Sequence, residues 1–343
     1  MSEPTAVKKS TLIDEGATIA EGVKIESGVT IEKGVAIEKG VTLKEGVIIE
    51  SGSIVESNST IEEGVQIGKS VIIEESVFIE SGVTIGESST IGRNSIIEKD
   101  VTFGNTAQIG NNVKIGRDAK IESVVILEQG VIIGRNAQVE QSAKVERDAT
   151  VERGAFVGKG AFIGRGVFLE QGSLVGRGAR VEGGTRVEED AKVEEGAIVR
   201  QGVIIGKDVE IQDRATVERG VTIEKGAIIG RDAIIKEGAK VEEGAQIGRD
   251  AKVGMESVIQ KNVMVTARAT IPSGSTCCSP PLVIAMGYLP VITVHTDGTV
   301  SMGGETLSAH DWRIRESLGD AVKSWSRLST EIQALAEALA RKA

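Results

Sequence analysis

Aromatic residues make up only 2% of this 343-residue chain. Ordinary mixed domains build much of their core from aromatic side chains, so a conventional globular core is excluded. Cysteine is almost as scarce: the only two are the neighbours Cys277 and Cys278. They are too few for a disulfide framework and fit a reducing compartment. We interpret them as small apolar residues; a redox or metal role is the alternative, but no second Cys or His cluster accompanies them.

Long apolar runs are also missing. No stretch of about 18 apolar residues occurs, and the opening "MSEPTAVKKSTLIDEG" lacks the apolar centre of a signal peptide. The net charge is −10, and Lys and Glu alternate without forming blocks. The sequence therefore predicts a cytoplasmic protein with neither nucleic acid nor a membrane as its partner.

Repetition is the feature that the chain does have. Every sixth residue from Ile13 to Ile271 is Ile, Val, Leu or Phe, at all 44 positions and without an insertion. Two residues before each of them, from Thr11 to Ala269, the residue is Ala, Val, Ser or Thr. Each six-residue word thus places one small and one large side chain on the same face, which is the alternation of a β-strand.

A turn must follow each short strand. The residue three places after the large aliphatic, from Gly16 to Gly274, is Gly in 23 words, Asp in seven and Asn in five. These residues tolerate a positive φ. Short strands separated by such corners coil, and one word cannot cover its own buried face, so successive coils are expected to share one core.

The word runs aliphatic, Gly or Glu, two variable residues, a small residue and one more variable residue. It resembles the hexapeptide-repeat superfamily, of the bacterial transferase hexapeptide type, over about residues 7 to 276. The resemblance implies an all-β solenoid, a left-handed parallel β-helix with three words per triangular coil and about 15 coils. With a strand spacing of ~4.8 Å, we expect a stiff shaft roughly 70 Å long.

The repeat ends in a Pro-rich junction, residues 272–290. Beyond it, "PVITVHTDGTVSMGG" predicts a β-hairpin about Asp297 and Gly298, and the segment from Ser308 onward predicts an amphipathic helix. We therefore divide the chain into a β-helix, residues 1–271, and a C-terminal cap, residues 272–343.

The resemblance also implies a catalytic possibility, since many relatives are trimeric acyltransferases with a catalytic His between subunits. Residues 1–294 contain no His, and His295 and His310 lie beyond the repeat, where the family motif assigns no role. The three-His zinc site of the related γ-class carbonic anhydrases cannot be built either. "TIPSGST", residues 270–276, resembles the last coil of acetyltransferases beside acetyl-CoA, but "CCSPPLVIAMGYLP" departs from the segment that normally follows. We expect no catalytic residue, cofactor or metal.

Outward positions carry the candidate contacts. Of the 44 residues that precede the large aliphatics, 18 are large and apolar, six on each predicted face. The candidates for outward apolar contacts are Phe156, Phe162, Phe168, Leu174, Ile228 and Ile234. The predicted C-terminal helix has an apolar stripe that is a candidate for self-association, or alternatively a lid on the last coil: Leu318, Val322, Trp325, Ile332 and Leu339.

The leading hypothesis is a non-catalytic structural or scaffolding shaft. Its expected partner is itself, as a homo-oligomer (a trimer or a filament), or another protein. The alternative is an acetyl-CoA-dependent acyltransferase of the hexapeptide family with an unrecognised site, because one fold can host both functions.

Overall fold

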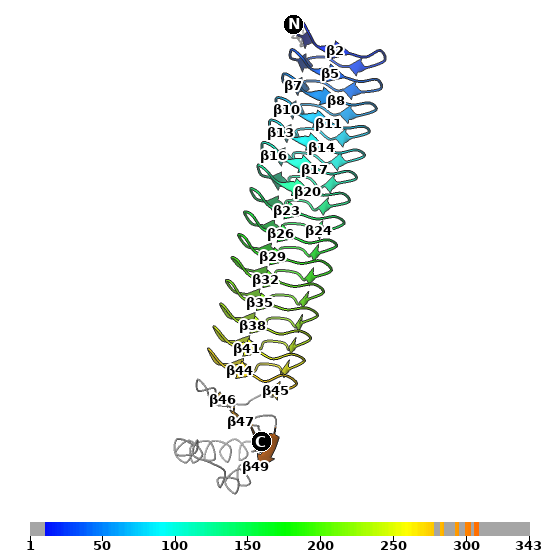
Figure 1. The fold of residues 1–343 in the computed structure, drawn as a ribbon. Helices are drawn as coiled ribbons and strands as arrows, with labels where there is room; N and C mark the ends of the chain where they lie inside the picture. The colour runs from blue at the N-terminus through cyan, green and yellow to red at the C-terminus, as the bar shows by residue number, and fades with distance from the viewer. Residues whose placement is uncertain (1–10, 278–281, 285–291, 295–298, 303–304, 309–343) are drawn as a thin grey trace, which may run out of the picture. The chain divides into compact units, whose positions relative to one another are not determined.

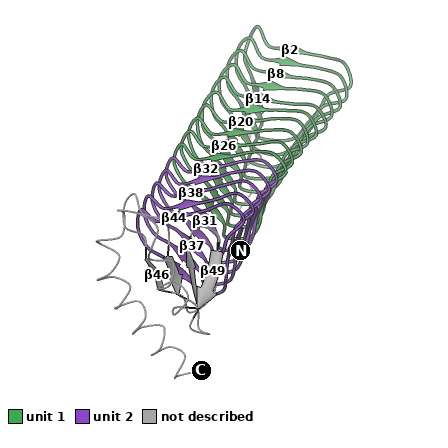
Figure 2. Ribbon diagram, turned by 60° about the horizontal axis from the view of Figure 1, so that its bottom comes forward, with its two compact units in different colours: residues 1–184 green, residues 185–343 purple. Residues whose placement is uncertain are grey.

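The computed structural model describes residues 11–277 and, further on, the backbone of residues 282–284, 292–294, 299–302 and 305–308. Its contacts divide the chain into unit 1, residues 1–184, and unit 2, residues 185–343 (Figure 2). Each unit is described by itself.

Unit 1 is built from two-residue strands that repeat every six residues, from β1 (Leu12–Ile13) to β29 (Arg180–Val181). Each strand pairs in parallel with the strand three places on, so that Leu12 lies opposite Thr30. One turn is therefore 18 residues long, and the strands form three parallel sheets: sheet A with β1, β4 and every third strand, sheet B from β2 (Thr18–Ile19), and sheet C from β3 (Lys24–Ile25). Figure 1 shows these successive turns.

Unit 2 continues the pattern from β30 (Arg186–Val187) to β45 (Thr276–Cys277), again in three parallel sheets. Residues 11–277, the continuously described part of the two units, contain 45 such strands, or 15 turns of three. The prediction of an all-β solenoid with about 15 turns is confirmed.

A four-stranded antiparallel sheet follows in unit 2. Its strands are β46 (Leu282–Ile284), β47 (Ile292–Val294), β48 (Thr299–Met302) and β49 (Glu305–Ser308). Strands β47 and β48 pair with Val294 opposite Val300. Asp297 and Gly298, the predicted hairpin turn, lie outside the described residues, and the C-terminal cap stays a prediction. The predicted helix after Ser308 lies outside the described residues. The division of the chain at residue 271 stays a prediction.

The core is made of the two inward residues of each word. Ala155 and Val157 are both fully buried, and the same holds along the repeat from Val29 to Ile271. Where the small residue is Ser, its hydroxyl can bond to the backbone of the next turn. Ser53 Oγ donates to the carbonyl of Gly68 at 2.8 Å and accepts from the amide of Val71 at 3.1 Å. The buried hydroxyl of Ser53 is thereby satisfied, whereas that of Ser173, which is also buried, has no hydrogen-bond partner among the described residues.

Every corner residue from Gly16 to Gly274 has the expected positive φ. The values are 61° to 91° for glycines and 54° to 63° for the other residues. The phase of the repeat imposes this conformation even on Val124, at φ 63°. A β-branched residue there is strained, because its side chain crowds the backbone.

The Glu that often follows the large aliphatic has a structural role that the sequence did not reveal. Its carboxylate accepts a hydrogen bond from a backbone amide in the next turn. This amide belongs to the residue just before the corner residue, and no strand pairing uses it. Thus the amide of Ser51 donates to Glu32 at 3.0 Å, and that of Lys159 donates to Glu140 at 2.9 Å. These charge-assisted bonds link successive turns outside the sheets.

Candidate functional site

The six outward apolar candidates all occupy the first position of a strand. Phe156 and Leu174 begin β25 (Phe156–Val157) and β28 (Leu174–Val175), which are paired in register in sheet A. The remaining four begin β26 (Phe162–Ile163), β27 (Phe168–Leu169), β37 (Ile228–Ile229) and β38 (Ile234–Ile235). All six side chains are half-buried. Their role in binding a partner stays a prediction.

Cations from adjacent turns cover one of these rings. The guanidinium of Arg180 lies 4.3 Å from the ring centroid of Phe162, and Nζ of Lys144 lies 5.9 Å from it. Both contacts are within the range of cation–π attraction. Other outward residues are more accessible: Phe78, Ile96 and Ile132 in sheet C are 37%, 43% and 45% exposed.

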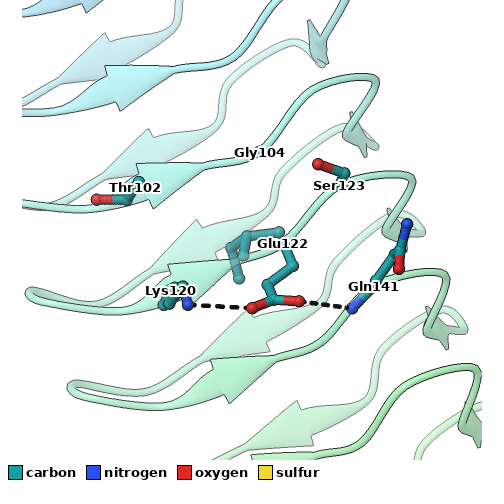
Figure 3. Close-up of a pocket in the computed structure, with 7 residues that line it drawn as sticks. Thr102, Gly104, Lys120, Glu122, Ser123 and Gln141 are labelled. Carbon is teal, nitrogen blue, oxygen red and sulfur yellow. Dashed lines mark hydrogen bonds and ion pairs between the residues drawn. The ribbon is translucent and has the colours of Figure 1, made fainter.

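A hollow of about 390 Å³ lies on the side of unit 1. Three successive turns form it, with Thr102 and Gly104 in the first, Lys120 to Ser123 in the second and Gln141 in the third (Figure 3). Gly104 lies against the next turn, because a Cβ there would be 2.5 Å from the amide nitrogen of Ser123. Only glycine therefore fits at this position without moving the backbone of the neighbouring turn.

Glu122 is the charged group in the middle of the hollow. Its Oε1 lies 3.0 Å from Nζ of Lys120, and its Oε2 accepts from the amide of Gln141 at 3.3 Å (Figure 3). The hydrogen bond from Lys120 lowers the pKa of this carboxyl below its ordinary value, against the opposing effect of desolvation. An ionised, paired carboxylate is a poor general acid and a weak general base near neutral pH. The hollow offers polar groups for binding but no evident catalytic pair.

The chemical inventory of the described residues is limited. No residue among them is a histidine, since His295 and His310 both fall outside. Within that same part of the chain, no three Cys, Asp or Glu side chains come close enough to hold a metal ion. The residues placed by the structure also include no helix of the length and apolarity needed to cross a membrane.

Two sets of predicted residues remain to be placed. Cys277 is buried, 2% exposed, at the large-aliphatic position of its word, in keeping with the apolar interpretation. Cys278 lies outside the described residues, as do the five candidates for self-association, Leu318, Val322, Trp325, Ile332 and Leu339.

The geometry described so far defines a class: a parallel β-helix of two-residue strands with a left-handed backbone conformation at every corner. Within this class, the sequence model of one protein family, described as "Hexapeptide repeat of succinyl-transferase", matches residues 220–267. Residues 220–267 therefore carry the hexapeptide repeat of this family, and the same six-residue word with paired parallel strands extends through the described turns. No curated protein sequence is significantly similar to it.

Solved structures with a similar fold include three transferases. PerB from Caulobacter crescentus, in complex with CoA and GDP-perosamine, is 19% identical, with 41% of this chain and 52% of PerB covered and a TM-score of 0.26. The acetyltransferase domain of PglB from Neisseria gonorrhoeae is 20% identical, with 42% and 55% covered and a TM-score of 0.17. The UDP-N-acetylglucosamine acyltransferase from Bacteroides fragilis is 16% identical, with 58% and 70% covered and a TM-score of 0.30.

This chain spans about half the length of the PerB and PglB chains that it matches. At these identities and TM-scores, the matches carry no argument about activity.

Proposed function

We propose that this protein is a non-catalytic scaffold, whose β-helix presents fixed columns of side chains to a partner. The observation that carries the proposal is the unbroken phase of the repeat. All 44 corners from Gly16 to Gly274 keep the same backbone conformation, and no inserted loop interrupts the described turns. In enzymes, loops on a rigid framework usually supply the walls of a substrate pocket.

The regular exterior suits a scaffold because it repeats at a fixed spacing. Residues 18 positions apart lie one above the other, about 4.8 Å apart, throughout each unit. A partner with the same spacing can therefore make many identical contacts. The partner is proposed to be a second copy of the chain, in a homo-oligomer or filament, or another protein. The cytoplasmic location and the C-terminal cap belong to the same proposal.

Acyl transfer is the second candidate function, and the comparisons favour it more directly than they favour a scaffold. The family model that matches residues 220–267 is described as a hexapeptide repeat of succinyl-transferase. For this chain, the hollow beside Lys120 and Glu122 is the place where a small polar substrate would be sought.

Calorimetric titration of the full chain with acetyl-CoA and with succinyl-CoA separates the two functions. A scaffold is expected to give no binding heat with either compound, and micromolar binding of either one would overturn the scaffold. Lys120→Ala is the matched control, since it removes a charged side chain that lines the hollow and adds no atom against the neighbouring turn. Binding that disappears in this variant would place the substrate there, whereas binding that survives would place it elsewhere.

A further inference from the structure

One edge of unit 1 separates its charges into an acidic and a basic half. The edge follows sheet C, and the residue just before the corner residue in each of seven successive turns contributes to it. In order along the unit, these residues are Glu45, Glu63, Ser81, Lys99, Arg117, Arg135 and Arg153, which we call the charged edge. Two acidic residues are thus followed, after Ser81, by four basic ones.

Backbone hydrogen bonds fix the spacing of the charged edge. The carbonyl of each member accepts from the corner amide of the next turn: Gly64 donates to Glu45 at 3.0 Å, and Gly172 donates to Arg153 at 3.1 Å. The side chains therefore form one column with a rise of about 4.8 Å per turn, roughly 29 Å from first to last.

The charges at both ends of this column are unused within the described part of the chain. Glu45, Glu63, Arg117, Arg135 and Arg153 are exposed, and none of them forms an ion pair with another described residue. In contrast, many charged residues on other columns are paired across turns, such as Lys207 with Glu189 at 2.8 Å. The charged edge is thus an exposed row of charges available to a partner.

We infer that two copies of this chain associate antiparallel along the charged edge, about a two-fold axis at the level of Lys99. Such an axis places Glu45 of one copy opposite Arg153 of the other, and Glu63 opposite Arg135. Each contact occurs twice, because a two-fold interface is self-complementary. Glu45 with Arg153 and Glu63 with Arg135 are pairs of opposite charge, while Ser81 faces Arg117 and Lys99 faces itself beside the Asp100 that each copy already pairs with it at 3.9 Å. The identical rise of both copies keeps these pairs in register.

The neighbouring face of sheet C supplies an apolar centre for the same contact. Ile96 begins β15 (Ile96–Ile97) at the level of Lys99, so the axis places Ile96 against itself. Phe78 of β12 (Phe78–Ile79) would meet Lys114 of β18 (Lys114–Ile115), a pairing that suits cation–π attraction. The exposure of Phe78 and Ile96, 37% and 43%, leaves both accessible.

The far edge of sheet C carries Lys39, Glu75, Arg93 and Arg147, which the same axis would not pair by charge. The contact is therefore centred on the charged edge and the adjoining part of the face. Seven turns of the whole face, about 15 Å wide, would bury at most roughly 1,000 Å² in total, the lower limit for a specific interface. Association is accordingly expected to be moderate in affinity and weakened by salt.

This inference names the partner and geometry of the scaffold and rests on that proposal. Charge reversal tests it in the full-length protein by sedimentation velocity at low salt. Glu63→Arg and Arg135→Glu should each weaken association at least tenfold, because each substitution creates like charges at two places. The double variant should restore association, since it only exchanges the charges. Glu87→Arg and Arg177→Glu, at the same word position on another edge, are the matched controls and should associate like the parent.

Cross-linking tests the position of the axis. Lys99→Cys should give a covalent dimer on oxidation, because the axis places residue 99 opposite itself. Ser81→Cys should not, since the two copies of residue 81 would lie roughly 10 Å apart along the length of the β-helices. The absence of the Lys99→Cys dimer, or failure of the double charge variant to recover, would overturn the inference. Either result would leave the CoA titration unaffected, so the proposed scaffold would be judged separately.

Discussion

Replacing Gly160 by Val tests whether the corner conformation itself limits stability. Gly160 has a φ of 65°, and no atom lies within 4 Å of the place where a Cβ would be added. A steric clash with a neighbouring turn is therefore excluded as the cause of any effect. What remains is the cost of holding a β-branched residue in the left-handed region.

The size of the effect follows from two opposing contributions. Holding an L-residue in the left-handed conformation costs roughly 1–2 kcal/mol, and a β-branched residue should lie near the upper end. Replacing glycine also restricts the unfolded chain, which returns about 0.4–1 kcal/mol. We expect Gly160→Val to lower the free energy of unfolding by about 1 kcal/mol.

Guanidinium unfolding followed by circular dichroism measures this difference, with Gly160→Asn as the control. Asn tolerates a positive φ, so this variant should lose only a few tenths of a kcal/mol. Val124→Gly is the reciprocal change on the same edge: Val124 is 47% exposed and already strained, so the variant should stay within about 1 kcal/mol of the parent. A Gly160→Val protein as stable as the parent would refute the reasoning, as would a large loss in Val124→Gly.

Three further predictions concern the core, the pH response and the C-terminus. Ala155→Leu or Ala161→Leu should destabilise by roughly 1–3 kcal/mol, because both sites are buried and closely packed; an unchanged melting temperature would contradict this. The lowered pKa values of Glu122 and Glu128 mean that their contribution to stability is complete above about pH 4.3 and is lost as the pH falls below it. Replacing both by Gln should therefore flatten the acid side of the stability curve, and an unchanged curve would count against it. Deleting residues 308–343 should lower the number of subunits per particle if the C-terminal stripe associates, whereas an unchanged number of subunits would leave the stripe as a lid.

The six-residue words were sufficient to predict the strands, the inward residues and the corners, whereas three words per turn followed only from the family resemblance. Inward positions such as Ala155 and Val157 follow from alternation, and the corner at Gly160 follows from the tolerance of glycine for positive φ. Even the conformation of Val124 follows, although no propensity would suggest it there. The regular six-residue repeat on both sides of Val124 fixes its backbone conformation, although that conformation is strained for a β-branched residue.

The side chains on the outside were predicted less well, because their neighbours lie a whole turn away in sequence. The half-burial of Phe162 depends on Lys144 and Arg180, each 18 residues distant. The amide bonded by Glu32 belongs to Ser51, 19 residues on. Six-residue periodicity alone does not specify which words become neighbours, and the hollow beside Gly104 likewise arises only when three particular turns are stacked.

The core of this protein repeats every six residues, but its exterior repeats every 18. Inserting one word between Ser81 and Lys99 would therefore leave every inward residue inward, while it would rotate all later columns onto the next edge. Glu63 and Arg135 would no longer lie on one line, although the hydrophobic pattern would be perfect. Insertions and deletions of three words shorten or lengthen the molecule without scrambling its surface. A gene of this kind can thus gain or lose whole turns without altering the columns of outward side chains. A change by a single word also preserves folding, but it alters which side chains share a column and so which partner the surface can bind.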